Sequence, residues 1–190
     1  MKQRFSKRTR LVSALLTLAM VFTFLPFSAF AANTEIDFNS PDFQLDFPDA
    51  EFQRFLKECC DKNGDGKLDV DIKNMTIPTS YGIKSLKGIE FFEDLEKLDC
   101  HGIGLTTLNV GKNFKLRELD CSYNQLKDYL YILSSGLKIL NCSHNNLTSM
   151  DLGILSGLKL EEVDCSYNKI WRIVMRSEEE LIKFDCSNNE

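Results

Sequence analysis

Serine, histidine, cysteine and aspartate are the residues of this chain whose types and spacing could support catalysis or bind a metal. Ser143 and His144 are adjacent, and neighbouring side chains of a strand point to opposite faces, which separates a nucleophile from its base. His101 and His144 belong to copies of a repeated segment that are two apart, about 10 Å, too far to share a metal ion. The sequence has no phosphate-binding loop, zinc motif or Gly-x-Ser-x-Gly motif. These patterns predict that the protein is not an enzyme.

Residues 61–72 carry oxygen-bearing side chains at the spacing of an EF-hand calcium loop. The candidate ligands are Asp61, Asn63, Asp65, Lys67 (through its carbonyl), Asp69 and Asp71. The twelfth position of such a loop normally supplies a bidentate Glu, but Ile72 stands there and Asp71 comes one residue early. Either Asp71 closes a distorted, weak calcium site, or the segment is an acidic turn without an ion. Calcium is the one cofactor that the sequence suggests.

Seven cysteines would ordinarily suggest a disulfide framework, but five of them recur with a period. The intervals are 21, 21, 23 and 21 residues, and the five are Cys100, Cys121, Cys142, Cys165 and Cys186. A fixed period indicates one side chain repeated in successive structural units. We predict inert, buried thiols, because side-by-side strand neighbours suit a disulfide poorly and apolar surroundings raise a thiol pKa. The redox state of the separate pair Cys59 and Cys60 is left open.

Each of these cysteines is the sixth residue of a copy that begins with leucine. The copies begin at Leu95, Leu116, Leu137, Leu160 and Leu181. Alternation along a strand points positions four and six inward and positions three, five and seven outward. The inward pairs are Leu98 and Cys100, Leu119 and Cys121, Leu140 and Cys142, Val163 and Cys165, and Phe184 and Cys186. Because one strand cannot bury its apolar side alone, the copies must stack about 4.8 Å apart as a parallel sheet.

Positions nine, fourteen and sixteen describe the rest of each copy. The pairs expected to close the opposite wall are Leu108 and Val110, Met150 and Leu152, and Ile173 and Met175, with Tyr129 and Tyr131 in the second copy. Position nine falls where the chain turns away from the sheet and is occupied by Asn124, Asn145, Asn168 and Asn189. We expect each amide to bond backbone groups of its own and the next repeat. Ile103 takes this place in the first copy, whose turn should be less well bonded.

This pattern resembles that of secreted bacterial leucine-rich repeat proteins over residues 79–190. The resemblance implies a repeat solenoid with a curved parallel β-sheet, a mostly irregular convex side and a concave sheet face that binds ligands. Terminal repeats need a cap, and residues 32–78 are expected to supply one. Within it we predict a helix over residues 49–60, whose apolar face is Phe52, Phe55, Leu56 and Cys59. Residues 73–94 read as an imperfect opening repeat, with Ile77, Ile83, Leu86 and Ile89 inward.

The outward positions are the candidate binding surface. Position five is mostly acidic, position seven is mostly serine, and position eight holds Tyr123, His144 and Tyr167. The candidate ligand-binding residues are Asp99, Asp120, Tyr123, Asn141, His144, Asp164, Tyr167 and Asp185. Such a surface suits a basic protein surface, a peptide or a polar glycan. The alternative interpretation is that Asp and Ser only favour entry into the turn.

The N-terminus and the net charge indicate the compartment and the partners. Five Lys and Arg residues, an apolar run over residues 11–27 and an Ala29-Phe30-Ala31 site predict a signal peptide over residues 1–31, with a retained membrane anchor as the alternative. Cleavage after Ala31 changes the net charge from −5 to −10. Nucleic acid is therefore not an expected partner, because phosphate binding needs clustered basic residues. We expect a secreted or cell-surface protein that does not insert into the membrane after signal cleavage.

Two functions are left open by these patterns. The first is an exported binding module that recognises a protein, a peptide or another surface ligand through its concave sheet face. The second is a structural or targeting arm of a larger cell-surface adhesin or enzyme. The second idea follows from the end of the sequence, which stops at Glu190 within a repeat, so the array is expected to be truncated there.

Overall fold

The computed structural model describes residues 36–190 except 69–71, 131, 135, 153–159 and 175–180. The predicted signal peptide lies outside the described residues. So do Asp69 and Asp71 of the predicted calcium loop, and Tyr131 and Met175 of the predicted far wall. None of the described helices has the length and apolar character that a membrane span requires.

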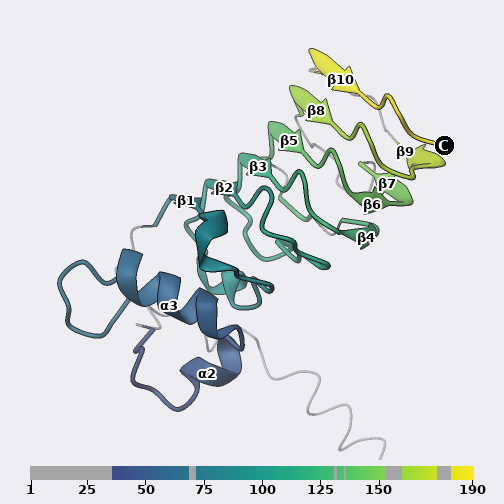
Figure 1. The fold of residues 1–190 in the computed structure, drawn as a ribbon. Coiled ribbons are helices and arrows are strands. Elements are labelled where there is room, and N and C mark those ends of the chain that lie inside the picture. The colour runs from purple at the N-terminus through teal and green to yellow at the C-terminus, as the bar shows by residue number, and fades with distance from the viewer. Residues whose placement is uncertain (1–35, 69–71, 131, 135, 153–159, 175–180) are drawn as a thin grey trace, which may run out of the picture. The chain divides into compact units, whose positions relative to one another are not determined.

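The described residues form a six-stranded parallel sheet, with one strand from the opening repeat and one from each of the five copies (Figure 1). In spatial order its strands are β1 (Asn74–Thr76), β2 (Lys97–Asp99), β3 (Glu118–Asp120), β5 (Ile139–Asn141), β8 (Glu162–Asp164) and β10 (Lys183–Asp185). Equivalent residues pair across every neighbouring strand, so Leu98 lies opposite Leu119 and Leu119 opposite Leu140. The fold is therefore a leucine-rich-repeat-type solenoid, as predicted. Its ladder starts at β1, before the expected domain boundary at residue 79.

The middle residue of each strand points into the core, which confirms the predicted alternation. Met75, Leu98, Leu119, Leu140 and Val163 are buried. The predicted inward residues of the opening repeat are also buried: Ile77, Ile83, Leu86 and Ile89. One continuous apolar core thus runs beneath the sheet, and each copy buries the apolar side that it could not bury alone.

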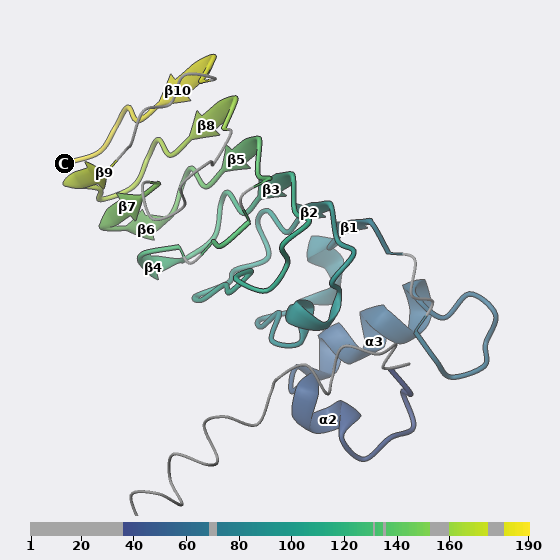
Figure 2. The ribbon, with the colours of Figure 1, turned by 180° about the vertical axis from the view of Figure 1, so that it is seen from behind.

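Short strands and loops form the opposite wall of the solenoid (Figure 2). The strands there are β4 (Lys127–Asp128), β6 (Asn146–Leu147), β7 (Ser149–Asp151) and β9 (Arg172–Val174), paired as β4 with β6 and β7 with β9. The predicted wall residues Leu108, Val110, Met150 and Leu152 are buried, and Ile173 is half-buried. The prediction was wrong for Tyr129, which is 64% exposed. The left-handed backbone of Asp128 (φ 62°) interrupts the alternation just before it.

The asparagines of position nine connect consecutive copies. The Asn145 amide nitrogen donates to the carbonyl of Cys121 in the preceding copy (3.0 Å) and to Cys142 and Ser143 in its own copy (both 3.1 Å). Its carbonyl oxygen accepts the Leu126 N–H, again from the preceding copy (3.0 Å). The expected bond to the next repeat is therefore wrong in direction. The amide reaches back, because each turn packs against the turn of the copy before it.

The same arrangement recurs at the other three asparagines, Asn124, Asn168 and Asn189. In the first copy Ile103 is buried and brings no amide. The N–H groups of Gly104 and Leu105 in that turn donate instead to the Asn124 carbonyl oxygen (2.9 and 2.8 Å). The second copy thus supplies side-chain bonds to the turn of the first.

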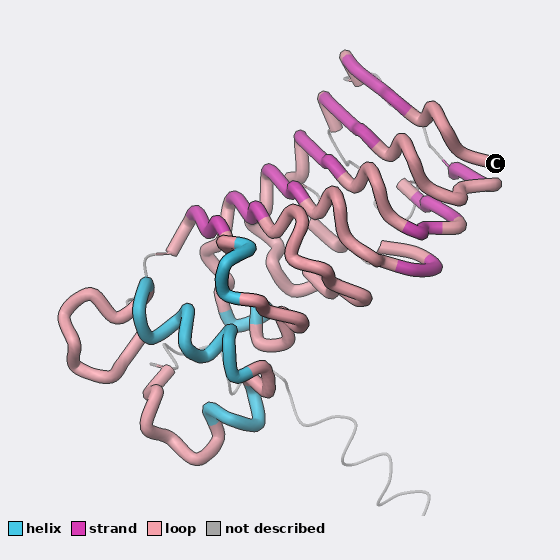
Figure 3. The backbone as a smooth tube through the Cα atoms, in the orientation of Figure 1, coloured by secondary structure: helices cyan, strands magenta, loops and turns pink. Residues whose placement is uncertain are grey.

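A small helical cap lies at the β1 end of the sheet (Figure 3). Its helices are α2 (Phe43–Asp46) and α3 (Ala50–Cys59), followed in the chain by the 3-10 helices η2 (Thr79–Tyr81) and η3 (Ile89–Phe91). The Asp49 carboxylate caps α3 by accepting the N–H groups of Glu51 and Phe52 (both 3.0 Å), and its second oxygen accepts those of Lys84 and Ser85 (both 2.8 Å). One residue therefore begins the helix and joins it to the first repeat.

The predicted helix over residues 49–60 is confirmed, but one residue of its apolar face is corrected. Phe52, Phe55 and Leu56 are buried, whereas Cys59 is exposed and Cys60 is buried in its place. The helix ends at Cys59, and Cys60 leaves the helical backbone at φ −123° and ψ 10°. Helical spacing therefore no longer decides which of the two side chains points inward.

The cysteine column is buried except at its last member. Cys100, Cys121, Cys142 and Cys165 have no exposed surface, and no described cysteine forms a disulfide. Burial raises the pKa of Cys165 to about 12 and the pKa values of Cys121 and Cys142 well above the ordinary range. Cys186 is exposed, contrary to the prediction, because it follows β10, which is the edge strand of the described sheet.

This burial pattern predicts the thiol reactivity of the folded protein. In the mature chain at pH 8, two thiols, Cys59 and Cys186, are expected to react quickly with a chromogenic disulfide reagent. The remaining five should react only after unfolding, because they are buried, and burial also raises the pKa values of four of them, Cys100, Cys121, Cys142 and Cys165. The control is the same titration in denaturant, which should yield all seven thiols. A third fast thiol in the native protein would contradict the arrangement.

Candidate functional site

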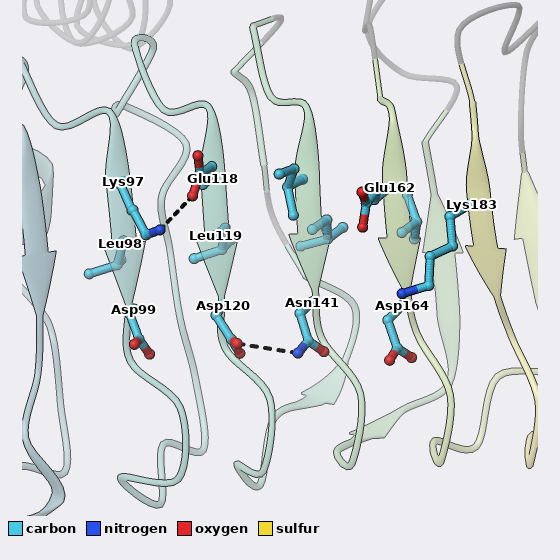
Figure 4. A pocket seen from close by; sticks show the side chains of 13 residues that line it. Lys97, Leu98, Asp99, Glu118, Leu119, Asp120, Asn141, Glu162, Asp164 and Lys183 are labelled. Carbon is cyan, nitrogen blue, oxygen red and sulfur yellow. Dashed lines mark hydrogen bonds and ion pairs between the residues drawn. The ribbon is translucent and has the colours of Figure 1, made fainter.

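The outward side of the sheet is a shallow groove of about 330 Å³ that crosses the strands from β2 to β10. Two rows of side chains line it (Figure 4). The first, at position five, consists of Asp99, Asp120, Asn141 and Asp164, and Asp185 on β10 continues this row beyond the groove. The second, at position three, consists of Lys97, Glu118, Ile139, Glu162 and Lys183. We call the two rows together the outward sheet face.

The position-three row was not among the predicted site residues. The same alternation that selected position five places position three outward, so the signal was present in the sequence. In the structure Lys97 forms an ion pair with Glu118 (2.7 Å), and that bond raises the pKa of Lys97. Figure 4 shows Lys183 reaching from β10 toward β8. Ile139 lies between the two charged ends of the row and is 37% exposed, so an apolar surface occupies the middle of the face.

The predicted acidic row does form a column, but one oxygen of each side chain is hydrogen-bonded within its own turn. One side-chain oxygen of each residue accepts the N–H two residues later: Asp99 from His101, Asp120 from Ser122, Asn141 from Ser143, Asp164 from Ser166, and Asp185 from Ser187. These bonds lower the pKa of Asp185, the row's outermost member. The interpretation as turn-forming residues therefore holds for one oxygen of each side chain. The second Asp120 oxygen accepts from the Asn141 amide across the face (3.2 Å).

Three of the four serines of position seven are buried and do not form the exposed hydroxyl stripe that the sequence suggested, whereas Ser187 in the last copy is exposed. Ser122, Ser143 and Ser166 are buried, and their hydroxyls donate to the position-five side chains at 2.6 to 2.8 Å. The turn folds each hydroxyl back onto the residue two places before it. The Ser143 hydroxyl thus donates to Asn141 in its own turn (2.8 Å).

His101 replaces serine at position seven of the first copy. Its Nδ1 lies 2.7 Å from an Asp99 oxygen, and this hydrogen bond raises the pKa of His101. The ion pair therefore stabilises the fold fully below the ordinary histidine pKa, and the contribution is lost as pH rises through the raised value. Among the described residues, no group of three or more potential metal ligands converges.

Three aromatic residues of position eight form a stack beside the acidic row. The Tyr123 and His144 rings lie 4.1 Å apart at 11°, and the His144 and Tyr167 rings lie 4.3 Å apart at 8°. Tyr123 and Tyr167 are 61% and 51% exposed. We call these three residues the aromatic stack. The structure brings together residues that the sequence had placed in one column.

The stack depends on an unusual backbone conformation. Tyr123, His144 and Tyr167 all have left-handed backbone, with φ of 54°, 54° and 53°. Such angles are uncommon for bulky residues and cost roughly 1–2 kcal/mol each. Because the same turn recurs in every copy, the three side chains leave the backbone in the same direction and their rings stack. Sequence reasoning identified the column but not the backbone that aligns it.

The predicted calcium loop is described only over its first part. The Gly66 N–H donates to one Asp61 oxygen (3.1 Å), while the other Asp61 oxygen is buried and has no hydrogen-bond partner among the described residues. The Asn63 amide donates to Asp65 (3.0 Å), so these two side chains are turned toward each other. Lys67 forms an isolated antiparallel bridge with Asp37, which fixes the loop backbone. A cation bound at loop position one would give this Asp61 oxygen a partner. The hydrogen bond between Asn63 and Asp65 would have to break before both side chains could bind the same cation.

The comparison with protein families supports the repeat assignment. A family model described as Leucine Rich Repeat matches residues 136–158. No curated protein matches the chain. One of the 23 matching chains of solved structures is described as "Functional domain of InlJ from Listeria monocytogenes includes a cysteine ladder", with 21% sequence identity and a TM-score of 0.46. The match covers 78% of this chain and 47% of that one, so this chain spans about half the length of the InlJ domain.

Proposed function

We propose that the chain is an exported recognition module that binds a basic segment of a protein ligand on its outward sheet face. The observation that carries the proposal is the groove over β2 to β10, with an acidic row at one edge and Ile139 exposed in its centre. An exposed apolar residue ringed by charged groups is the usual composition of an interaction site. Solenoid folds present such extended surfaces for binding. The proposal assigns the chain no catalytic step.

The charges favour a cationic ligand. The mature chain is expected to carry a net charge of −10, and four of the five position-five residues are aspartates. A basic ligand would be attracted over a distance and oriented by this row, while an apolar side chain seated on Ile139 would be removed from water. Acidic ligands, nucleic acid among them, would be repelled by the same row.

A selection experiment tests this function without a known ligand. Peptides selected from a random library on the immobilised mature chain should be rich in Lys and Arg. Their affinity should fall at least about tenfold, or 1.4 kcal/mol, for Ile139→Lys and for Glu162→Lys. Both side chains lie on the face but take no part in the turn bonds. Lys127→Glu, on β4 of the opposite wall, is the control and should leave binding unchanged.

Two results would overturn the assignment. Peptides that bind the Ile139→Lys variant as well as the wild type would place the site elsewhere. Failure to select any peptide, together with capture of glycans from an array, would replace the protein ligand by a carbohydrate. Export is a separate part of the proposal and rests on the N-terminal pattern. The secreted product should begin at Ala32, which mass spectrometry of the extracellular protein would reveal.

Weak calcium binding by the loop over residues 61–72 is a further part of the proposal, supported by the unpartnered Asp61 oxygen. Extracellular loops of this kind have dissociation constants of about 0.1–1 mM. At 5 mM calcium and a constant of about 0.5 mM, the mature chain should gain about 1.4 kcal/mol of stability. Thermal unfolding with calcium and with magnesium measures the gain. Asp61→Asn should abolish it, Asp42→Asn outside the loop should not, and an unchanged midpoint would show an acidic turn without an ion.

A further inference from the structure

Position eight of the first copy is a gap in the aromatic column. Five successive copies have the same left-handed backbone there: Gly102 (φ 66°), Tyr123 (54°), His144 (54°), Tyr167 (53°) and Asn188 (56°). The three central copies fill the position with a ring, and the first copy fills it with hydrogen. Because the backbone repeats, a ring at Gly102 would lie directly against Tyr123, as His144 does on its other side.

The space over Gly102 is open. A β-carbon built on Gly102 would meet one atom within 4 Å, the Thr79 methyl carbon at an ordinary contact distance of 3.6 Å. Close packing therefore does not demand glycine here. His101 does not occupy the space either, since its ring is bonded to Asp99 and, among the described residues, Tyr123 makes its ring contact with His144. Tyr123 is 61% exposed, and among the described residues no aromatic ring stacks on the side of it that faces Gly102.

The chemistry around this face selects a planar cation. A tyrosine ring carries negative potential on its face and attracts cations that lie over it. Asp99 and Asp120 stand three residues before Gly102 and Tyr123, in the acidic row. An arginine guanidinium is flat, permanently charged and able both to stack and to bond carboxylates, which a lysine ammonium cannot do equally well.

We propose that the open Tyr123 face above Gly102 is a subsite for an arginine side chain of the ligand. We call it the Gly102 slot. It deepens the proposed function and rests on it, because it specifies one basic residue of the ligand and places it beside the acidic row of the outward sheet face. The guanidinium takes the place of the missing ring and extends the column Tyr123–His144–Tyr167 by one layer.

The slot is tested directly with N-acetylarginine amide, so the test does not depend on finding a ligand. In a two-dimensional NMR titration of the mature chain, the probe should shift the Tyr123 ring signals at about 10–100 mM, as expected for a single cation–π contact with little other surface. N-acetyllysine amide should shift them at least about threefold less at equal concentration. Equal shifts with lysine or with N-acetyltyrosine amide would overturn the guanidinium assignment, and no shift would overturn the slot.

Two variants remove the slot in different ways. Gly102→Tyr fills it with a ring, on a backbone that tyrosine already adopts one copy later, and Tyr123→Leu removes the stacking face. Both should abolish the arginine-induced shifts near Gly102, with the thermal midpoint showing that the variants fold. Asn188→Tyr, which adds a ring at the other end of the column, is the matched control and should keep the response. A response that survives both Gly102→Tyr and Tyr123→Leu would place the arginine site elsewhere.

The selected peptides separate this inference from the proposed function. Replacing their arginine by lysine should weaken binding to the wild type at least about fivefold and leave binding to Gly102→Tyr unaltered. If Ile139→Lys destroys peptide binding and Gly102→Tyr does not change it, the face is correct and the slot is wrong. If no peptide is selected but the free arginine probe binds, the slot stands and the larger ligand is wrong.

Discussion

Asn145→Ala is expected to destabilise the protein by about 3–5 kcal/mol. The change removes four hydrogen bonds, three donated to backbone carbonyls and one accepted from the Leu126 N–H. Asn145 is buried, so its former partners cannot turn to bulk water. Each buried polar group left without a partner costs about 1–3 kcal/mol. Equilibrium unfolding of the mature chain in urea measures the loss.

The chain supplies its own control for this prediction. Asn189 makes the equivalent bonds, to the carbonyls of Cys165 and Cys186 and from the Ile170 N–H, but lies half-exposed at the end of the array. Water can replace the lost bonds there, so Asn189→Ala should cost about 1 kcal/mol or less. Equal losses of stability at the two positions would show that burial does not determine how much these asparagine hydrogen bonds contribute.

These amides also explain why the copies are expected to unfold together. Each asparagine forms hydrogen bonds with its own copy and with the preceding copy. The interface between neighbouring copies therefore contains hydrogen bonds as well as apolar contacts. Stability in a repeat array is the sum of each copy's own stability and the terms between neighbours. Removal of Asn145 weakens one interface in the middle of the array, and its effect should therefore appear as a broader unfolding transition as well as a lower midpoint.

Periodicity in the sequence predicted the inward residues because one rule acts in every copy. Leu119, Cys121 and their equivalents alternate on a strand, and stacking leaves one side for apolar groups. The rule fails at the edge strand of the described sheet, where Cys186 is exposed. It also fails at Cys59, where the helix ends and its spacing no longer applies. Those errors fall at the ends of periodic elements.

The sequence predicted which residues of the candidate site share a repeat position, but not how their side chains are oriented. Residue types showed that Tyr123, His144 and Tyr167 share a position, yet their stacking arises from left-handed backbone that these residue types do not favour. The prediction for the serines also failed because alternation does not describe the turn that follows each strand. A side chain just after a strand can turn back to the residue two places earlier, and alternation alone places Ser122 outward although its hydroxyl is bonded inside the turn.

Gly88→Ala is expected to destabilise the cap by about 3–4 kcal/mol. Gly88 has φ 103°, which costs an L-residue roughly 1–2 kcal/mol, and a β-carbon there would lie 2.3 Å from the nearest carbon of the Phe47 ring. Phe47 is 1% exposed and packs against Phe43 and Phe91, with ring centroids at 4.8 and 5.6 Å, so it cannot move aside freely. Overpacking of a core adds about 1–3 kcal/mol. Urea unfolding of the mature chain measures the total.

Gly82→Ala isolates the backbone part of that cost. Gly82 also has left-handed backbone (φ 72°), but a β-carbon there would meet no atom within 4 Å, so a loss of about 1 kcal/mol is expected. The difference between the two variants is then the clash with Phe47. Combining Gly88→Ala with Phe47→Leu should cost less than the sum of the two single changes, because the smaller side chain makes room for the methyl group. Additive costs would show that strain at Gly88, rather than contact with Phe47, dominates the effect.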